Sequence, residues 1–329
     1  MRDRSNTMER GTRKASPRLL LLSVLLLSTS ASFGDAEAQH WWRCPPWGGG
    51  VLGTRATIDY LTHRRLAGRG TGTLGDMCAA TFVASQLRAL DLSPGDDNGD
   101  FLQPVPLPQN WHYRGEPGGA WNAVGVLRGT TGAGPTILVG AHHDHLGDAG
   151  GGRYYPGADD NASGVAALLG VARRLTEEPA LAHTVVFVTF TGEEISFQGS
   201  RHYVQNPALP LHRNHLMINL DMVGRLREAP LDIRGLAELG DQERVLRSYL
   251  ARTTLPVQLT DRAGGGSDHQ VFVNAGVPSL YVTTGFHSDR HRFSDVPEKL
   301  NLPGIEEVAD LVAGLIRALE RTIDQGAEG

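Results

Sequence analysis

The sequence is poor in cysteine and lysine. Cys44 and Cys78 are the only cysteines in 329 residues, which excludes a small fold held together by disulfides. They form no C-x-x-C pair, so the sequence indicates neither a thiol redox motif nor a cysteine-rich structural zinc site. Lys14 and Lys299 are the only lysines among 31 basic residues, an imbalance that codon usage in a GC-rich genome explains without a special role for arginine.

An excess of basic residues is also missing. The chain has 36 acidic residues and a formal net charge of -5, whereas a general nucleic-acid binder shows a basic balance or a basic stripe. We therefore expect no nucleic-acid partner. Hydrophobic residues make up 40% of the chain, which excludes a wholly disordered protein and suffices for one large domain or two modest ones.

Residues 1–38 have the three parts of a secretory signal peptide. Four basic residues between positions 10 and 18 precede the apolar run Leu19–Leu27, and Ala36-Glu37-Ala38 provides a small-residue cleavage site. The alternative is a membrane anchor, but the run is shorter than the roughly 20 residues that a spanning helix needs. No cysteine sits at the end of the run, which argues against a lipoprotein. We expect a secreted or periplasmic protein without stable membrane association.

Both cysteines are C-terminal to the expected signal peptide. In an oxidising compartment they could pair and tie the N-terminal segment to the first long helix. Two separate thiols are the alternative, because the sequence does not give their distance.

After an irregular lead-in over residues 39–53, residues 54–325 have the pattern of a single α/β domain. Short apolar runs predict buried strands, and amphipathic stretches between them predict helices. Their alternation predicts a three-layer sandwich, with a mixed, mainly parallel central sheet flanked by helices. The expected strands span 123–127, 136–141, 185–190, 216–220 and 279–282, and the expected helices span 54–66, 76–90, 163–175, 242–252 and 305–323.

Imidazole and carboxylate side chains follow these expected strands. His142–His145 come after one strand, Glu193 and Glu194 after another, and Asp221 ends a third. Because α/β sheets bind ligands at the carboxyl ends of their strands, we expect these groups at one rim. Clustered carboxylates repel one another unless a divalent cation is present, and mixed His and carboxylate ligands suit zinc, with manganese or cobalt as alternatives.

Five motifs occur in an order that closely resembles the M28-type di-zinc aminopeptidases, over roughly residues 54–322. They are His142-x-Asp144, Gly157–Gly164, Gly192-Glu193-Glu194, Asn219–Met222 and His291-x-x-Ser294-Asp295. The resemblance implies a zinc exopeptidase fold and a catalytic domain that cleaves peptides with two bound zinc ions.

The resemblance also implies a role for each site residue. Asp160 would bridge the two zinc ions and precede a cis peptide bond to Asn161. Glu193 would be the general base for a zinc-activated bridging water. The remaining ligands would be His142 and Asp221 on one ion, and Glu194 and His291 on the other.

Other residues near these motifs have supporting or open roles. Asp144 would hold His142 in the correct tautomer, and Asp268 would either support the site from behind or cap the following helix. We expect His143, His145 and His287 to line or tune the site rather than bind metal. Many relatives have tyrosine just before the last zinc histidine, but this chain has Arg290. The group that stabilises the tetrahedral intermediate is therefore unassigned: it could be that guanidinium, another group or zinc alone.

The favoured function is a secreted aminopeptidase that takes peptide substrates. The alternatives are a single-zinc glutaminyl cyclase on the same fold and a non-catalytic peptide-binding homologue. Carboxypeptidase action and hydrolysis of a non-peptide amide are also left open. No Gly-x-Ser-x-Gly elbow is present, consistent with a mechanism that needs no nucleophilic serine. The sequence does not indicate the side-chain preference or the oligomeric state, and it is compatible with a monomer.

Overall fold

A computed structural model describes residues 43–326, apart from residues 96–97, 113, 133 and 241. The predicted signal peptide and the first residues of the lead-in lie outside this range. Among the described residues, no helix is both long and apolar enough to cross a membrane.

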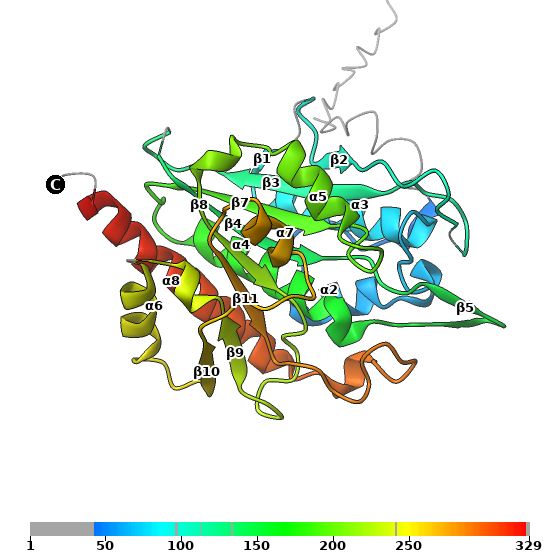
Figure 1. The fold of residues 1–329 in the computed structure, drawn as a ribbon. Helices are drawn as coiled ribbons and strands as arrows, with labels where there is room; N and C mark the ends of the chain where they lie inside the picture. The colour runs from blue at the N-terminus through cyan, green and yellow to red at the C-terminus, as the bar shows by residue number, and fades with distance from the viewer. Residues whose placement is uncertain (1–42, 96–97, 113, 133, 241, 327–329) are drawn as a thin grey trace, which may run out of the picture. The chain divides into compact units, whose positions relative to one another are not determined.

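One mixed sheet forms the centre of the fold (Figure 1), with the strand order β1-β3-β7-β4-β8-β11-β9-β10 and with β2 paired to β3. Four central strands, β7, β4, β8 and β11, run parallel. The strand β3 is antiparallel to β7, and β9 is antiparallel to β11 but parallel to β10. The predicted mixed α/β sheet is confirmed. The strands span Ser93–Pro94 (β1), Leu102–Pro104 (β2), Trp121–Leu127 (β3), Thr136–His142 (β4), Thr184–Phe190 (β7), Asn214–Leu220 (β8), Leu231–Arg234 (β9), Val257–Thr260 (β10) and Ser279–Thr283 (β11). A separate hairpin pairs β5 (Asp148–Gly150) with β6 (Arg153–Tyr154).

Helices cover both faces of the sheet because its central strands are apolar on both sides. In β7, Val185 and Phe187 belong to the larger hydrophobic cluster, whereas Val186, Val188 and Phe190 belong to a second one. In Figure 1, α5 and α7 lie in front of the sheet and α3 lies behind it. The helices span Thr54–Leu61 (α2), Leu74–Ala89 (α3), Gly164–Glu177 (α4), Gln198–Gln205 (α5), Gln242–Leu250 (α6), His269–Asn274 (α7) and Leu302–Gly326 (α8).

The main departure from the expected elements lies in the first helix, which ends at Leu61 rather than Leu66. A separate 3-10 turn follows at Arg64–Leu66, and Ala67 and Arg69 adopt positive φ angles. The buried Arg69 side chain then turns back and donates a hydrogen bond to the Leu61 carbonyl at the end of α2. This tertiary contact satisfies a carbonyl that a longer helix would have used internally.

Cys44 and Cys78 form a disulfide, with their Cα atoms 5.4 Å apart. Of the two alternatives that the sequence left open, the structure therefore has the pairing. The disulfide joins the lead-in to α3. Next to it, the indole ring of Trp47 packs edge-on against Tyr60 and Phe82.

Candidate metal centre

Three neighbouring parallel strands deliver acidic and imidazole side chains to one edge of the sheet. The strand β4 ends at His142, and β7 and β8 flank it and are followed by Glu193-Glu194 and Asp221. The carboxyl ends of adjacent parallel strands meet at the same edge, which is why residues so distant in sequence become neighbours. Asp160 reaches this edge from an irregular helical turn, Ala158–Ser163, and His291 reaches it from a loop.

A first donor group consists of His142, Asp160 and Asp221, all of them buried. The His142 Nε2 atom lies 3.4 Å from a carboxylate oxygen of Asp160 and 3.4 Å from one of Asp221. The other ring nitrogen, Nδ1, donates to the backbone carbonyl of Asp144 at 3.2 Å. All three ligand atoms therefore converge on one point.

A second donor group shares Asp160 with the first. The His291 Nε2 atom lies 3.1 Å from the Oδ2 atom of Asp160 and 3.4 Å from Glu194 Oε2. His145 joins this group, because its Nδ1 atom donates to Glu194 Oε1 at 2.8 Å. The structure thus brings together the five ligands expected from the sequence and adds His145, which was expected only to line the site.

The Asp160 loop is held by hydrogen bonds to its backbone. The Asp295 carboxylate accepts from the backbone N–H groups of Asp159 and Asp160 at 3.0–3.1 Å. The peptide bond between Asp160 and Asn161 is cis, as the family resemblance implied. The turn needs glycine at position 157, where φ is +58° and a Cβ atom would lie 2.3 Å from the Asp160 carbonyl oxygen.

The unsatisfied atoms of these groups fit a divalent cation. The atoms Asp160 Oδ2, Asp221 Oδ1 and His291 Nε2 are buried and have no hydrogen-bond partner. Burying carboxylate oxygens without a partner is unfavourable, whereas a bound cation would satisfy them. The donor set contains imidazole and carboxylate groups, which is the combination that zinc accepts.

Ion pairs between histidines and carboxylates shift the pKa values of the donor groups. Burial lowers the pKa of His142, but Glu193, Asp221 and other carboxylates outweigh it and raise this pKa well above its usual range. The close Asp160 and Glu194 carboxylates raise the pKa of His291 to about 9. A cation must therefore displace protons from both histidines, so its affinity should fall at lower pH.

Glu193 lies beside these groups without belonging to either. It is 9% exposed, and its backbone N–H donates to the Oδ1 atom of Asp144 at 3.2 Å. Burial raises the pKa of the Glu193 carboxyl well above its usual value, and the nearby Asp268 and Asp221 carboxylates add to this shift, although His142 opposes it.

The structure refines the expected supporting roles of Asp144 and Asp268. The Asp144 carboxylate lies 3.7 Å from His142 Nδ1, farther away than the backbone carbonyl oxygen of Asp144 at 3.2 Å. The carboxylate instead accepts a hydrogen bond from Thr71 Oγ1 at 2.6 Å. Asp268 is buried and accepts from Ser200 at 2.5 Å, and its side chain makes no cap on α7. Burial raises the pKa of Asp268 to about 7.

Three further side chains lie in or near the motifs in sequence, and each has its own contacts. His143 contacts Asp76 at 3.2 Å, and His287 contacts Asp159 at 3.0 Å, so these two histidines are engaged outside both donor groups, as expected. Arg290 lies in the site: its Nε atom is 3.6 Å from Asp160 Oδ2, and its guanidinium stacks 4.5 Å from the centre of the Phe286 ring.

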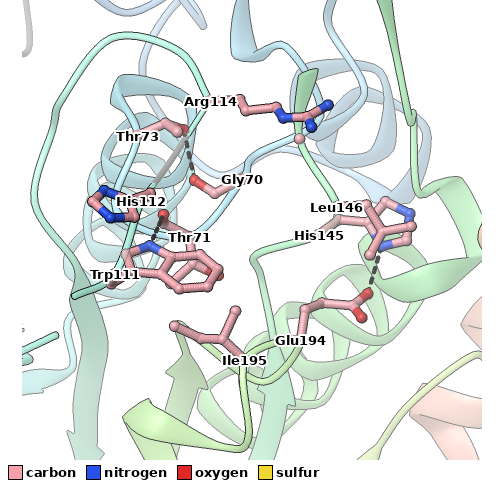
Figure 2. A pocket seen from close by; sticks show the side chains of 11 residues that line it. Gly70, Thr71, Thr73, Trp111, His112, Arg114, His145, Leu146, Glu194 and Ile195 are labelled. Atoms are coloured by element: carbon pink, nitrogen blue, oxygen red, sulfur yellow. Dashed lines mark hydrogen bonds and ion pairs between the residues drawn. The ribbon is translucent and has the colours of Figure 1, made fainter. Parts of the chain in front are cut away.

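A pocket of about 250 Å³ adjoins the second donor group, with which it shares His145 and Glu194. Figure 2 shows the indole of Trp111 and the side chain of Ile195 on one side of it, and Arg114 across from them. No sequence pattern predicts this pocket, because its walls come from four separate loops with no shared motif.

Residues 122–316 match peptidase family M28. The chain is 29% identical to "Aminopeptidase YwaD" of Bacillus subtilis (strain 168), over 59% of this chain and 44% of that protein. It is 30% identical to "Leucine aminopeptidase 2" of Trichophyton equinum, over 80% of this chain and 50% of that protein. The chain thus spans about half the length of the curated relatives it matches.

Solved structures show the same fold at low identity. A zinc aminopeptidase from Bacillus subtilis, BSAP, superposes with a TM-score of 0.62 at 19% identity, covering 83% of this chain and 95% of that one. Porphyromonas gingivalis glutaminyl cyclase gives a TM-score of 0.62 at 21% identity, covering 82% of this chain and 97% of that one. Motif order, sheet topology and the match over residues 122–316 agree: the chain belongs to peptidase family M28.

Proposed function

We propose that this chain is an exported exopeptidase that removes N-terminal residues from peptides and holds two zinc ions. The observation that carries the proposal is Asp160, whose two carboxylate oxygens face different donor groups, with the buried Glu193 beside them. The names of its relatives support aminopeptidase activity, since "Aminopeptidase YwaD" and "Leucine aminopeptidase 2" share the family.

In this proposal Asp160 would contribute to both ion sites. His142 and Asp221 would complete one site, and Glu194 and His291 would complete the other. When bound, the ions would act as Lewis acids that polarise the scissile carbonyl and acidify a water molecule. We prefer His291 to His145 as the ligand, because His291 Nε2 lies close to both carboxylates and has no hydrogen-bond partner. His145 instead orients Glu194 through its 2.8 Å hydrogen bond.

Glu193 acts as the general base and then as the general acid. Its carboxylate takes a proton from the attacking water and passes it to the leaving amine nitrogen. Burial raises its pKa, which makes it a better proton acceptor than an exposed glutamate would be.

We further propose that residues 1–38 are a signal peptide, residues 39–53 a lead-in and residues 54–325 the catalytic domain. The disulfide between Cys44 and Cys78 supports export, because such bonds persist mainly in oxidising compartments.

A zinc count and a substrate panel test the proposed function. We expect about two zinc ions per chain by elemental analysis, and hydrolysis of aminoacyl anilides with a free amine but not of their N-acetylated forms. Less than one zinc, or equal hydrolysis of both forms, would overturn the proposal. Release of ammonia from glutaminyl peptides, without anilide hydrolysis, would establish the cyclase alternative instead.

Separate substitutions of the two competing histidines test the ligand assignment. H291A should lower the zinc content from about two ions to about one, because it removes a ligand. H145A should keep both ions at saturation but weaken binding about 10- to 100-fold, because it removes a group that orients a ligand. The matched control H212A, at an exposed histidine, should change neither value. The opposite pattern would make His145 the ligand.

A further inference from the structure

We propose that the pocket beside Glu194 is a subsite that selects an acidic side chain next to the bond that is cut. This inference rests on the proposed peptidase function. The pocket shares His145 and Glu194 with the second donor group, so a peptide whose scissile carbonyl reaches the metal centre places a neighbouring side chain at the pocket mouth. A volume of about 250 Å³ is below the roughly 300–1,000 Å³ of pockets for drug-sized ligands, and suits one side chain.

Three apolar side chains line the pocket, and a hydrogen bond holds one of them. Trp111, Ile195 and Leu146 surround the space in Figure 2. The indole Nε1 atom of Trp111 donates to the Thr71 carbonyl at 3.2 Å, and Thr71 in turn donates to Asp144 behind the metal centre. These walls would pack against the methylene groups of a bound side chain.

The loop that carries Trp111 is anchored at its far end. The Leu74 backbone N–H donates to the Glu116 carbonyl at 2.6 Å, and the Gly118 backbone N–H donates to the Gly72 carbonyl at 3.0 Å. These bonds hold Glu116 and Gly118 against the turn before α3, two to four residues after Arg114.

Arg114 is the only arginine or lysine among the residues that line the pocket. Arg114 and His112 line it together with His145, and Glu194 is the only acid among its lining residues. Glu194 is already bonded to His145 and is assigned to metal. Arg114 forms no ion pair with a carboxylate of the described residues, and the acid nearest to it in sequence, Glu116, pairs with Arg43. An acidic side chain would supply the missing partner, with its carboxylate on the guanidinium.

Hydrolysis of two peptide series by the zinc-loaded protein tests this subsite. The series are X-Ala-Ala and Ala-X-Ala with X as Glu, Gln or Lys, because the first and second residues flank the bond that an aminopeptidase cuts. At one of these positions we expect kcat/KM to be about 10-fold higher for Glu than for Lys, with Gln between them. R114E should reverse this order, and R114Q should remove most of it.

The control is R128E, which makes the same charge change at an exposed arginine just after β3. Leu127 pairs with Val185 at the start of β7, so Arg128 lies at the edge of the sheet opposite the metal centre. R128E should leave the order Glu, Gln, Lys unchanged. The subsite is overturned if the peptides are cleaved without a charge preference at either position, or if R128E shifts the preference as much as R114E. If no peptide is cleaved at all, the proposed function fails and the subsite fails with it.

Discussion

Replacing Glu193 with glutamine is expected to lower kcat for anilide hydrolysis by about 10²- to 10⁴-fold, the usual contribution of a general acid–base group. Glutamine keeps the shape of the side chain but no longer accepts the proton of the attacking water. Neither donor group includes Glu193, so the zinc content should stay at its wild-type value. The loss should therefore appear in kcat, with the fold and the metal retained.

Two measurements separate this result from a structural defect. Elemental analysis should give the same zinc content for E193Q as for the wild type, and the far-UV circular dichroism spectra should coincide. The matched control is E177Q, at an exposed glutamate at the end of α4, which should leave kcat unchanged. Full activity in E193Q would remove Glu193 from the mechanism, and loss of zinc from E193Q would make it a ligand.

The core strands and the strand-end residues of the site could be predicted from the sequence. Buried parallel strands are continuous apolar runs, so β4, β7 and β8 are visible as patterns, and the polar residues that follow them must share an edge. Asp160 lies in the irregular helical turn Ala158–Ser163 and His291 in a loop, where periodicity carries little information, and only the motif resemblance implied their roles as ligands. The strand β9 and the edge strand β10 beside it were missed because each has only four residues and is partly polar.

Other features could not be predicted from the sequence, because they depend on tertiary contacts between distant loops. His145 was expected only to line the site, yet its Nδ1 atom bonds Glu194, 49 positions away. The Trp111 pocket needs a loop between β2 and β3 to fold over the turn before α3, and no local pattern specifies that contact. The arginine excess was left without a functional explanation, but one of those arginines now has a structural role.

Arg69 is completely buried and donates to four backbone carbonyls. Its guanidinium reaches the carbonyl oxygens of Leu61, His143, Pro156 and Gly157 at 2.6–2.9 Å. It thereby joins the end of α2 to the loop after His142 and to the turn before Asp160. Burial lowers the pKa of Arg69 to about 10, and nearby carboxylates led by Asp144 oppose this shift, so the guanidinium stays charged at neutral pH.

R69M is therefore expected to lower the free energy of unfolding by about 3–5 kcal/mol, because it leaves several buried carbonyls without a donor. R69K should lose a large part of the same stability, since an ammonium group presents its donors from one point and does not span the four carbonyls.

The measurement is denaturant unfolding of the metal-free protein with its disulfide intact. R244M, at an exposed arginine of α6, is the matched control and should stay within about 0.5 kcal/mol of the wild type. A loss below about 1 kcal/mol in R69M would show that water satisfies these carbonyls. The zinc affinity of R69M should fall together with its stability, because Arg69 joins His143, directly after the proposed ligand His142, to the turn before the proposed ligand Asp160.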